Sequence, residues 1–369
     1  MRFPSFEGEW ETKKLGEIGE IVTGSTPPTN DESYYGGEHL FVSPADIQTN
    51  RYVNNSKTTL TLKGFRKGRK IKKGSSLFVC IGSTIGKVAQ ASEDCVTNQQ
   101  INSIVSLEHN ADFVFSLLEF SSKKIKLLSA EQAVPIINKT TFSNVQINIP
   151  SLSEQAKIAS FLSIIDKRIQ TQNKIIEQLE TLIQELRNQI FKRKIRFTDT
   201  DGRDFVDWKK VKIGDILKIG NGKDYKHLQS GEIPVFGTGG FMTLVNDYLY
   251  DGETVCIGRK GTIDKPMYHE GKLWTVDTLF YTHSFQSCIP KFIFHLFQTI
   301  NWLEYNEASG VPSLSKTTIE KIGLQIPSIE EQERIASFLN KIDHKIQTEK
   351  AILEQLEMKK KYLLKQMFV

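Results

Sequence analysis

Two long stretches of the chain carry apolar residues in a heptad-like pattern. Between Ser151 and Phe191 the apolar positions are separated by alternating steps of four and three residues. The stretch from Ser328 to Phe368 repeats the pattern and matches the first at about half of its positions, and neither stretch contains proline or glycine. This spacing predicts two helices of about 38 residues, each roughly 55–60 Å long, whose apolar seams pair with each other.

The predicted seams are apolar except at the equivalent polar positions Gln172 and Glu349 and at Lys360. A polar seam residue costs stability and fixes the register of a helix pair. If a twofold axis perpendicular to the helices relates the two halves, the helices run antiparallel. Hydroxyl groups of Ser153 and Ser328 are expected to cap them. The seam comprises Ile158, Leu162, Ile165, Ile169, Gln172, Ile176 and Leu179 in the first helix, and Ile335, Leu339, Ile342, Ile346, Glu349, Leu353 and Leu356 in the second.

The repetition extends beyond the helices. Val134-Pro135 recurs as Val311-Pro312, and Ile149-Pro150 recurs as Ile326-Pro327. A further signature opens each half: Trp10 with Leu15-Gly16-Glu17-Ile18, then Trp208 with Ile213-Gly214-Asp215-Ile216. A repeat of this length indicates a duplicated architecture. Because the frame is duplicated while the interior of each half differs, the chain is expected to hold two different recognition modules in equivalent positions.

The segments between these signatures combine short β-rich runs and a few helical stretches, separated by glycine-containing turns. This predicts two α+β modules joined by the long helices. The predicted strands are Ser76–Ile81, Ile101–Leu107, Thr254–Ile257 and Leu279–Thr282, and the predicted helices are Phe113–Leu128 and Pro290–Tyr305. The expected domains are residues 1–150 (first module), 151–197 (first long helix and linker), 198–327 (second module) and 328–369 (second long helix).

Composition adds few constraints. The 369 residues include 48 Lys and Arg against 43 Asp and Glu, a net charge of +5 that permits nucleic-acid binding without demanding it. The four cysteines form no CxxC pair, and Cys80 and Cys256 each stand in a VCIG run, so buried structural thiols in a reducing compartment are expected. No apolar signal segment opens the chain and no apolar run approaches a membrane span, so we expect a soluble cytoplasmic protein with no membrane partner.

Basic residues cluster inside both modules. Lysine and arginine beside glycine suit phosphate contact, because the backbone can approach closely and donate its own N–H groups. We therefore expect these side chains to contact DNA, although a solvated loop is the plain alternative. They are Lys63, Arg66, Lys67, Arg69 and Lys70 in the first module, and Lys223, Arg259, Lys260 and Lys265 in the second.

Sequence patterns typical of catalysis are incomplete. Gly82–Lys87 resembles a nucleotide-binding loop but is one residue short and is followed by Val88. Phe236–Gly240 resembles a glycine loop for S-adenosylmethionine, but its glycine spacing is wrong. The histidines show no metal-ligand spacing. The chain is therefore predicted to be non-catalytic and to bind no metal or cofactor of its own.

Together these signatures resemble the specificity subunit of type I restriction-modification systems. The resemblance rests on the two Leu/Ile-Gly-acid-Ile runs, the repeated Ile-Pro followed by Glu154-Gln155 and Glu331-Gln332, and Gly202 with Phe205 and Trp208. It covers essentially the whole chain. Thr23–Pro28, Gly82–Lys87, Asn98–Gln100 and Asp277-Thr278 also resemble that family's target-recognition modules, which adds Ser83, Lys87, Asn98 and Gln99 to the expected DNA-binding residues. The second module lacks the Thr-Pro-Pro turn, so its loop is expected to be built differently.

The resemblance implies a non-catalytic subunit that binds double-stranded DNA. Each module would recognise one half of a split, asymmetric sequence, and the helices would set the gap between the halves. Two adenine methyltransferase subunits carrying S-adenosylmethionine would dock along the helices, and two motor-nuclease subunits, which use ATP and Mg, would complete the enzyme. The alternative is a stand-alone two-headed DNA-binding or architectural protein that dimerises through its coiled coil.

Overall fold

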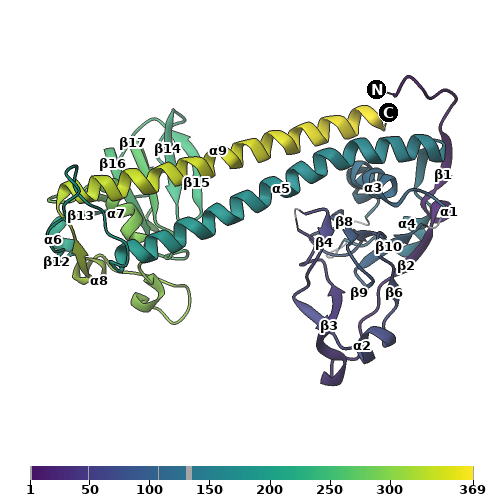
Figure 1. The fold of residues 1–369 in the computed structure, drawn as a ribbon, viewed down its shortest axis with the longest axis horizontal. Coiled ribbons are helices and arrows are strands. Elements are labelled where there is room, and N and C mark those ends of the chain that lie inside the picture. Colours follow the sequence, from purple (N-terminus) through teal and green to yellow (C-terminus); the bar gives the residue numbers. More distant parts are fainter. Residues whose placement is uncertain (1, 49, 107, 130–134, 369) are drawn as a thin grey trace. The chain divides into compact units, whose positions relative to one another are not determined.

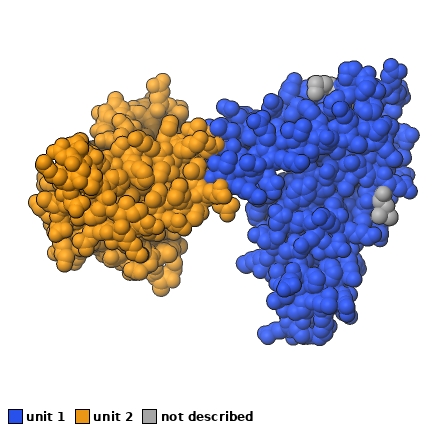
Figure 2. Space-filling view, in the orientation of Figure 1, with its two compact units in different colours: residues 1–175, 350–369 blue, residues 176–349 orange. Residues whose placement is uncertain are grey.

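The computed structural model describes residues 2–48, 50–106, 108–129 and 135–368. The chain forms two compact units (Figure 2). Unit 1 comprises Met1–Ile175 with Lys350–Val369, and unit 2 comprises Ile176–Glu349. The division falls inside both long helices, so each unit contains one α+β module and one stretch from each helix.

The described residues of unit 1 form three sheets, with strand orders β1-β11, β2-β10-β7-β8-β4 and β5-β3-β9-β6. Figure 1 shows the ribbon of the chain with most of these elements labelled. Helix α3 packs on strands β7 and β8 of the five-stranded sheet. The strands are β1 (Glu11–Lys14), β2 (Glu20–Thr23), β3 (Tyr35–Val42), β4 (Tyr52–Val53), β5 (Thr58–Leu60), β6 (Lys70–Ile71), β7 (Ser76–Val79), β8 (Val88–Ala91), β9 (Cys95–Thr97), β10 (Ile101–Val105) and β11 (Gln146–Ile149). The short helices are α1 (Leu15–Ile18), η1 (Glu32–Tyr34), α2 (Leu62–Lys67), α3 (Ala111–Lys126) and α4 (Lys139–Ser143).

Unit 2 repeats this frame with a two-stranded sheet, β12-β19, and a six-stranded sheet ordered β13-β18-β16-β17-β14-β15. Helix α7 packs on β16 and β17. The strands are β12 (Lys209–Lys212), β13 (Lys218–Asn221), β14 (Ile233–Gly237), β15 (Gly240–Val245), β16 (Tyr250–Gly258), β17 (Met267–Thr275), β18 (Leu279–His283) and β19 (Gly323–Ile326). The short helices are α6 (Ile213–Ile216), α7 (Pro290–Phe297), η2 (Trp302–Tyr305) and α8 (Lys316–Lys321).

The predicted α+β class and pair of long helices are confirmed. The helices are α5 (Leu152–Phe191) and α9 (Ile329–Met367). Several predicted details are wrong. The serine that caps α5 is Ser151, which accepts from the Glu154 amide as its equivalent Ser328 accepts from Glu331, whereas Ser153 lies inside the first turn.

The second error concerns the predicted helix Pro290–Tyr305, which is broken into α7 and η2. The indole of Trp302 folds back and donates to the Phe297 carbonyl at 3.0 Å, so it satisfies an acceptor at the end of α7. Strand β10 ends at Val105, before the predicted end at Leu107. Leu107 and Val134, which belong to the predicted strand and repeat, lie outside the described residues.

The long helices run antiparallel within each unit. In unit 1, Ile158 and Leu162 near the start of α5 share a core with Leu364 and Met367 near the end of α9. In unit 2, Ile183 and Ile190 of α5 share a core with the opening turns of α9, including Ile335, Leu339 and Ile346. The seam positions from Ile158 to Ile176 and at Ile335, Leu339, Ile346 and Glu349 are buried, whereas Leu179, Ile342, Leu353 and Leu356 are half-buried.

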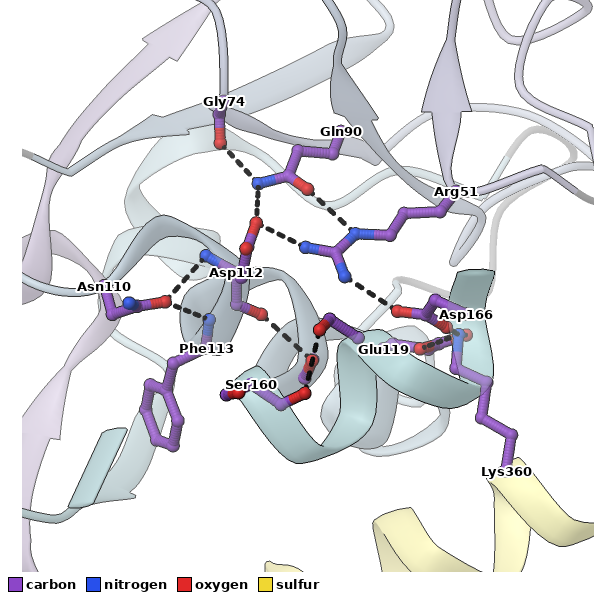
Figure 3. A network of polar contacts seen from close by, with 12 residues as sticks. Arg51, Gly74, Gln90, Asn110, Asp112, Phe113, Glu119, Ser160, Asp166 and Lys360 are labelled. Carbon is purple, nitrogen blue, oxygen red and sulfur yellow. Dashed lines mark hydrogen bonds and ion pairs between the residues drawn. The ribbon is translucent and has the colours of Figure 1, made fainter. Parts of the chain in front are cut away.

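The cation at the predicted break in the seam lies in a polar network (Figure 3). The ammonium group of Lys360 lies 2.8 Å from Asp166 of α5 and 2.6 Å from Glu119 of α3. Arg51, beside β4, donates to Asp166 at 2.7 Å and also binds Asp112 and Gln90. Its guanidinium also lies over the Phe115 ring, at 4.5 Å from the centroid. The network therefore ties the module of unit 1 to both long helices.

Unit 2 uses the equivalent aspartate in a simpler arrangement. Asp343 stands where Asp166 stands in the repeat, and it binds Arg187 of α5 at 2.8 Å. Arg187 also reaches the ring of His295 on α7, which is fully buried, and Asn340 accepts from the other ring nitrogen at 2.9 Å. Burial and the adjacent Arg187 lower the pKa of His295 to about 3, so this imidazole is neutral at neutral pH.

The repeated Glu-Gln pair attaches each module to its long helix. Gln155 accepts from the Asn110 amide and donates to the Pro150 carbonyl; Gln332 accepts from Ile289 and donates to Pro327 in the same way. The buried Glu154 binds Arg2 at 2.7 Å, and the buried Glu331 binds Arg196 and the indole of Trp208. The Glu-Gln motif therefore joins each module to its long helix, and the two halves make the same hydrogen bonds at this joint.

All four cysteines are buried and free. Burial raises the pKa of the Cys80, Cys95 and Cys256 thiols to about 12, as expected for structural cysteines. None of the helices among the described residues has the length and apolar composition that a membrane span requires. Within the same residues, no three His, Cys, Asp or Glu side chains are grouped as a metal site would need.

Candidate nucleic-acid interface

Three segments of unit 2 meet at the turn that joins β17 to β18. The Lys223 amide, after β13, donates to the Thr275 carbonyl at 2.9 Å, and the Val276 amide donates to the Phe236 carbonyl at 3.0 Å. The Arg259 amide, after β16, donates to the Thr278 carbonyl at 2.8 Å. We call residues 222–226, 259–265 and 276–278 loop cluster 2.

The same backbone bonds recur in unit 1. Ser25 donates to Thr97 at 2.8 Å, Asn98 donates to Val42 at 2.9 Å, and Cys80 donates to Gln100 at 2.8 Å. We call residues 24–28, 80–87 and 97–100 loop cluster 1. The shared bonds make the two clusters equivalent backbone frames that carry different side chains.

Glycines allow the closest approaches in both frames. A Cβ on Gly24 would lie 2.1 Å from the Asn98 carbonyl oxygen, and one on Gly222 would lie 1.9 Å from that of Val276. Gly24 and Gly222 therefore begin equivalent loops, although only the first continues into Thr-Pro-Pro. The expected difference between the loop after β2 and the loop after β13 therefore begins after Gly24 and Gly222.

The two VCIG runs are not structural equivalents. Val79 pairs with Ile101, whereas Gly258 pairs with Leu279, so Arg259 occupies the place of Cys80. Gly82 and Gly261 correspond, with φ of +95° and +94° and amides bonded to the Pro135 and Pro312 carbonyls. Identical letters do not mark equivalent positions here, because strand register depends on pairing across the sheet rather than on local identity.

The Gly82–Lys87 loop binds its own chain. The amides of Ile85, Gly86 and Lys87 donate to carbonyls of residues 82, 79 and 84, and the Lys87 ammonium lies 2.9 Å from the Ile47 carbonyl. A phosphate-binding loop needs its amides directed at the ligand. These amides are already occupied, which agrees with the incomplete sequence pattern.

The predicted basic residues of unit 1 are exposed but do not all lie together. Arg69 lies against loop cluster 1, since its amide donates to Ser25 Oγ at 2.8 Å and its guanidinium to the Thr23 carbonyl at 2.9 Å. Lys63 is instead directed at Asp31 and Ser33, and it lies over the Tyr34 ring. Arg66, Lys67 and Lys70 are exposed along and after α2.

Among the residues suggested by the family resemblance, Gln99 and Ser83 are exposed on loop cluster 1. Gln99 accepts a hydrogen bond from Thr26 at 2.6 Å, which places it beside the Thr-Pro-Pro turn. The Asn98 side chain forms hydrogen bonds within the turn: it donates to the Gln100 side chain and accepts from the Gln100 amide. These bonds within the turn favour a structural role for Asn98 over contact with a base.

In unit 2, Lys223, Arg259, Lys260 and Lys265 are all exposed on loop cluster 2. Arg259 donates to the Asp277 carbonyl at 3.2 Å. Arg259 and Lys260 also line a groove of about 650 Å³, together with Asn221, Asp277, Thr278 and Phe280. The groove is lined by three cations, Arg259, Lys260 and Lys316, and by two carboxylates, Asp277 and Glu307. Cations beside hydrogen-bonding groups suit a ligand that carries phosphate and polar base edges.

The sequence interpretation missed the hairpin formed by β14 and β15. Phe236–Gly240, considered only as an incomplete cofactor loop, spans the end of β14, the turn and the start of β15. Exposed side chains follow it: Phe241 is 60% exposed, Met242 49% and Leu244 43%. The alternation that marks a strand is interrupted by a β-bulge between Val235 and Phe236, so the period-two signal was weak.

Comparison with known proteins gives one family. The family described as "Type I restriction modification DNA specificity domain" matches residues 7–181 and 205–358. The MjaIX specificity subunit of Methanocaldococcus jannaschii is 28% identical over 58% of this chain, and the HindI specificity subunit of Haemophilus influenzae is 31% identical over 38%. The matched parts span 53% and 32% of those two relatives.

Other relatives match along most of their length. The EcoprrI specificity subunit of Escherichia coli is 23% identical, over 91% of this chain and 88% of that protein. Among solved structures, the S subunit of a type I restriction-modification system from M. genitalium superposes with a TM-score of 0.65, covering 100% of this chain and 99% of that one, at 17% identity. At that identity the structural likeness concerns the fold.

Proposed function

Since the chain belongs to the family of type I restriction-modification DNA specificity domains, we propose that it is a non-catalytic specificity subunit whose two units each recognise one half of a split DNA sequence. The observation that carries this proposal is the pair of loop clusters. They share their backbone hydrogen bonds but present Thr26, Arg69 and Gln99 in one unit and Lys223, Arg259 and Lys260 in the other. Equivalent frames with different side chains suit two different half-sites.

The same proposal covers the partners. Methyltransferase subunits with S-adenosylmethionine would dock along α5 and α9, and motor-nuclease subunits would supply ATP- and Mg-dependent cleavage. Two of each would complete a cytoplasmic enzyme, and this chain would supply the sequence recognition. Many exposed polar positions along α5 and α9 leave room for such docking.

The decisive experiment changes one loop cluster at a time. The chain is reconstituted with its methyltransferase subunits, and methylated adenines are mapped in a host genome. Arg259→Ala with Lys260→Ala should relax or weaken one half-site by about 1–3 kcal/mol per lost base contact and leave the other half unchanged. Arg69→Ala with Gln99→Ala should affect only the opposite half.

Lys209→Ala, an exposed lysine on β12, is the matched control and should leave both half-sites intact. A change in both halves from either cluster variant would contradict separate recognition. Failure to co-purify with a methyltransferase, combined with specific DNA binding by the chain alone, would favour the stand-alone two-headed DNA-binding protein.

A further inference from the structure

The hairpin β14–β15 of unit 2 ends in a narrow tip. Gly237 and Gly240 pair with each other, and Thr238 and Gly239 form the turn. A Cβ on Gly239 or Gly240 would meet no atom within 4 Å, so the tip stands clear of neighbouring groups. Strand β15 is the last strand of its sheet.

Large apolar side chains follow this tip directly. Phe241 and Met242 are exposed, and the Phe241 ring lies edge-on to the Phe236 ring, at 6.3 Å between centroids. Exposed apolar residues on an edge strand invite aggregation, and proteins usually avoid them with charge or proline. Their presence at a glycine-rich tip therefore points to a binding role.

The tip adjoins loop cluster 2. Thr238 Oγ1 lies 3.5 Å from the point where Gly261 would carry a Cβ, beside Arg259 and Lys260. On the other side, Met242 Sδ and Val276 Cγ2 both crowd the equivalent point of Gly237, at 2.9 Å and 3.4 Å. The apolar tip thus borders directly on a cationic turn.

Unit 1 has a different element in this place. Strand β3 corresponds to β14, because Val42 pairs in parallel with Thr97 as Phe236 pairs with Thr275. After Val42 the chain enters a turn in which Asp46 accepts from Ser43, and β3 pairs instead with β5, which leads into the basic helix α2. The apolar hairpin belongs to unit 2.

We propose that Phe241 forms a wedge that inserts between stacked base pairs of the half-site bound by unit 2 and thereby bends that half of the DNA, while Met242, which packs against Gly237, steadies the hairpin tip. This inference rests on the proposed function. Apolar side chains inserted at a base step unstack it, and the cost is lowest at flexible pyrimidine–purine steps. Arg259 and Lys260 would hold phosphates beside the opened step, so part of the specificity of this half-site comes from DNA deformability.

DNA fits this surface better than an apolar protein partner does. A protein interface of this chemistry would place Arg259, Lys260 and Lys223 at its edge, all exposed and close to the tip. Those cations match the phosphates on either side of a base step. A thin tip with few apolar side chains also suits a groove more than a broad protein surface.

The test uses the full chain with its methyltransferase subunits and duplexes carrying the mapped target. End-to-end fluorescence transfer reports bending, and 2-aminopurine placed at successive steps of the unit 2 half-site reports unstacking. Wild-type protein should brighten the probe at one step and bend the duplex. Phe241→Ala with Met242→Ala should abolish both signals and weaken specific binding about ten- to hundredfold.

Leu244→Ala is the matched control: an exposed apolar residue of the same strand, farther from the tip, that should leave bending unchanged. A mismatch at the brightened step should restore affinity to the double variant, because the unstacking cost is then already removed. If the double variant bends DNA like wild type, or loses a subunit while binding DNA normally, the wedge is wrong. If wild-type protein shows no specific binding at all, the proposed function falls with it.

Discussion

At the residue scale, the buried polar side chains do most to define the two halves. Glu154 and Glu331, with Gln155 and Gln332, occupy the same positions in the repeat and make matching hydrogen bonds. A buried polar group left without a partner is costly, so such a pair tolerates few substitutions. The repeated Glu-Gln letters therefore mark a joint between module and helix.

His295 predicts a pH dependence of unit 2. The unfolded chain protonates this histidine near pH 6.5, whereas the folded protein does so only near pH 3. Because the unfolded state binds the extra proton between these values, stability falls as the pH falls below 6.5. Between pH 7 and pH 5, the free energy of unfolding of His295→Gln should therefore fall by about 2 kcal/mol less than that of the wild type, as measured by urea unfolding.

His344→Gln is the matched control, since His344 is an exposed histidine on α9 in the same unit. That variant should keep the pH dependence of the wild type. An unchanged slope in His295→Gln would contradict the predicted neutral state beside Arg187 and Asp343.

The basic residues of α2 predict a salt effect. Arg66 and Lys67 are exposed in its last turn, and lysine-rich runs give mainly sequence-independent affinity. Arg66→Ala with Lys67→Ala should weaken cognate and non-cognate DNA alike and reduce the salt slope by about 0.9 per lost phosphate contact. Titrations at several salt concentrations test this, with Lys139→Ala on α4 as control. An unchanged slope would place α2 away from DNA.

At the element scale, Lys360 shows why a helix seam contains a cation. Asp166 and the half-buried Glu119 both face it, and burial raises the pKa of Glu119 despite this partner. Removal of one partner from a buried charge cluster leaves the others uncompensated. Lys360→Met should therefore destabilise the protein by about 2–3 kcal/mol at pH 8, measured by urea unfolding.

The raised pKa of Glu119 predicts how the effect of Lys360→Met should change with pH. A carboxyl whose folded pKa is raised takes up a proton as the pH falls, so the loss in Lys360→Met should be smaller at pH 5 than at pH 8. Adding Glu119→Gln should recover part of the stability at pH 8. If Lys360→Met is neutral at both pH values, the network contributes no net stability. The register function proposed for Gln172 and Glu349 stays a prediction.

At the scale of the whole molecule, the proposed function makes the helices a spacer. Deleting residues 173–179 from α5 and 347–353 from α9 removes one heptad from each and keeps the seam in phase. Seven residues correspond to about 10 Å, or about three base pairs. Methylome mapping should show a gap between half-sites shorter by about that amount, with both half-site sequences intact. An altered half-site with an unchanged gap would overturn the spacer.

The sequence alone determined the duplication, the long helices and the α+β class. These follow from signals that are local along the chain: the heptad steps from Ile158 onward, the absence of proline and glycine, and the repeated Glu-Gln pair. A helix needs only its own neighbours for its hydrogen bonds, so a periodic pattern is enough to predict it. The place of Arg259 beside a glycine-rich loop could also be predicted, because it depends only on neighbours along the chain.

Only the tertiary structure decided which residues meet. The two VCIG runs share their letters, but pairing across the sheet places Arg259 where Cys80 stands. Lys360 interrupts the apolar seam in the sequence, but in the structure its ammonium group binds Glu119. Arg51, which is also distant in sequence, binds Asp166 beside it. Strand register and buried charge pairs depend on contacts between segments far apart along the chain, and no local pattern specifies which segments those are.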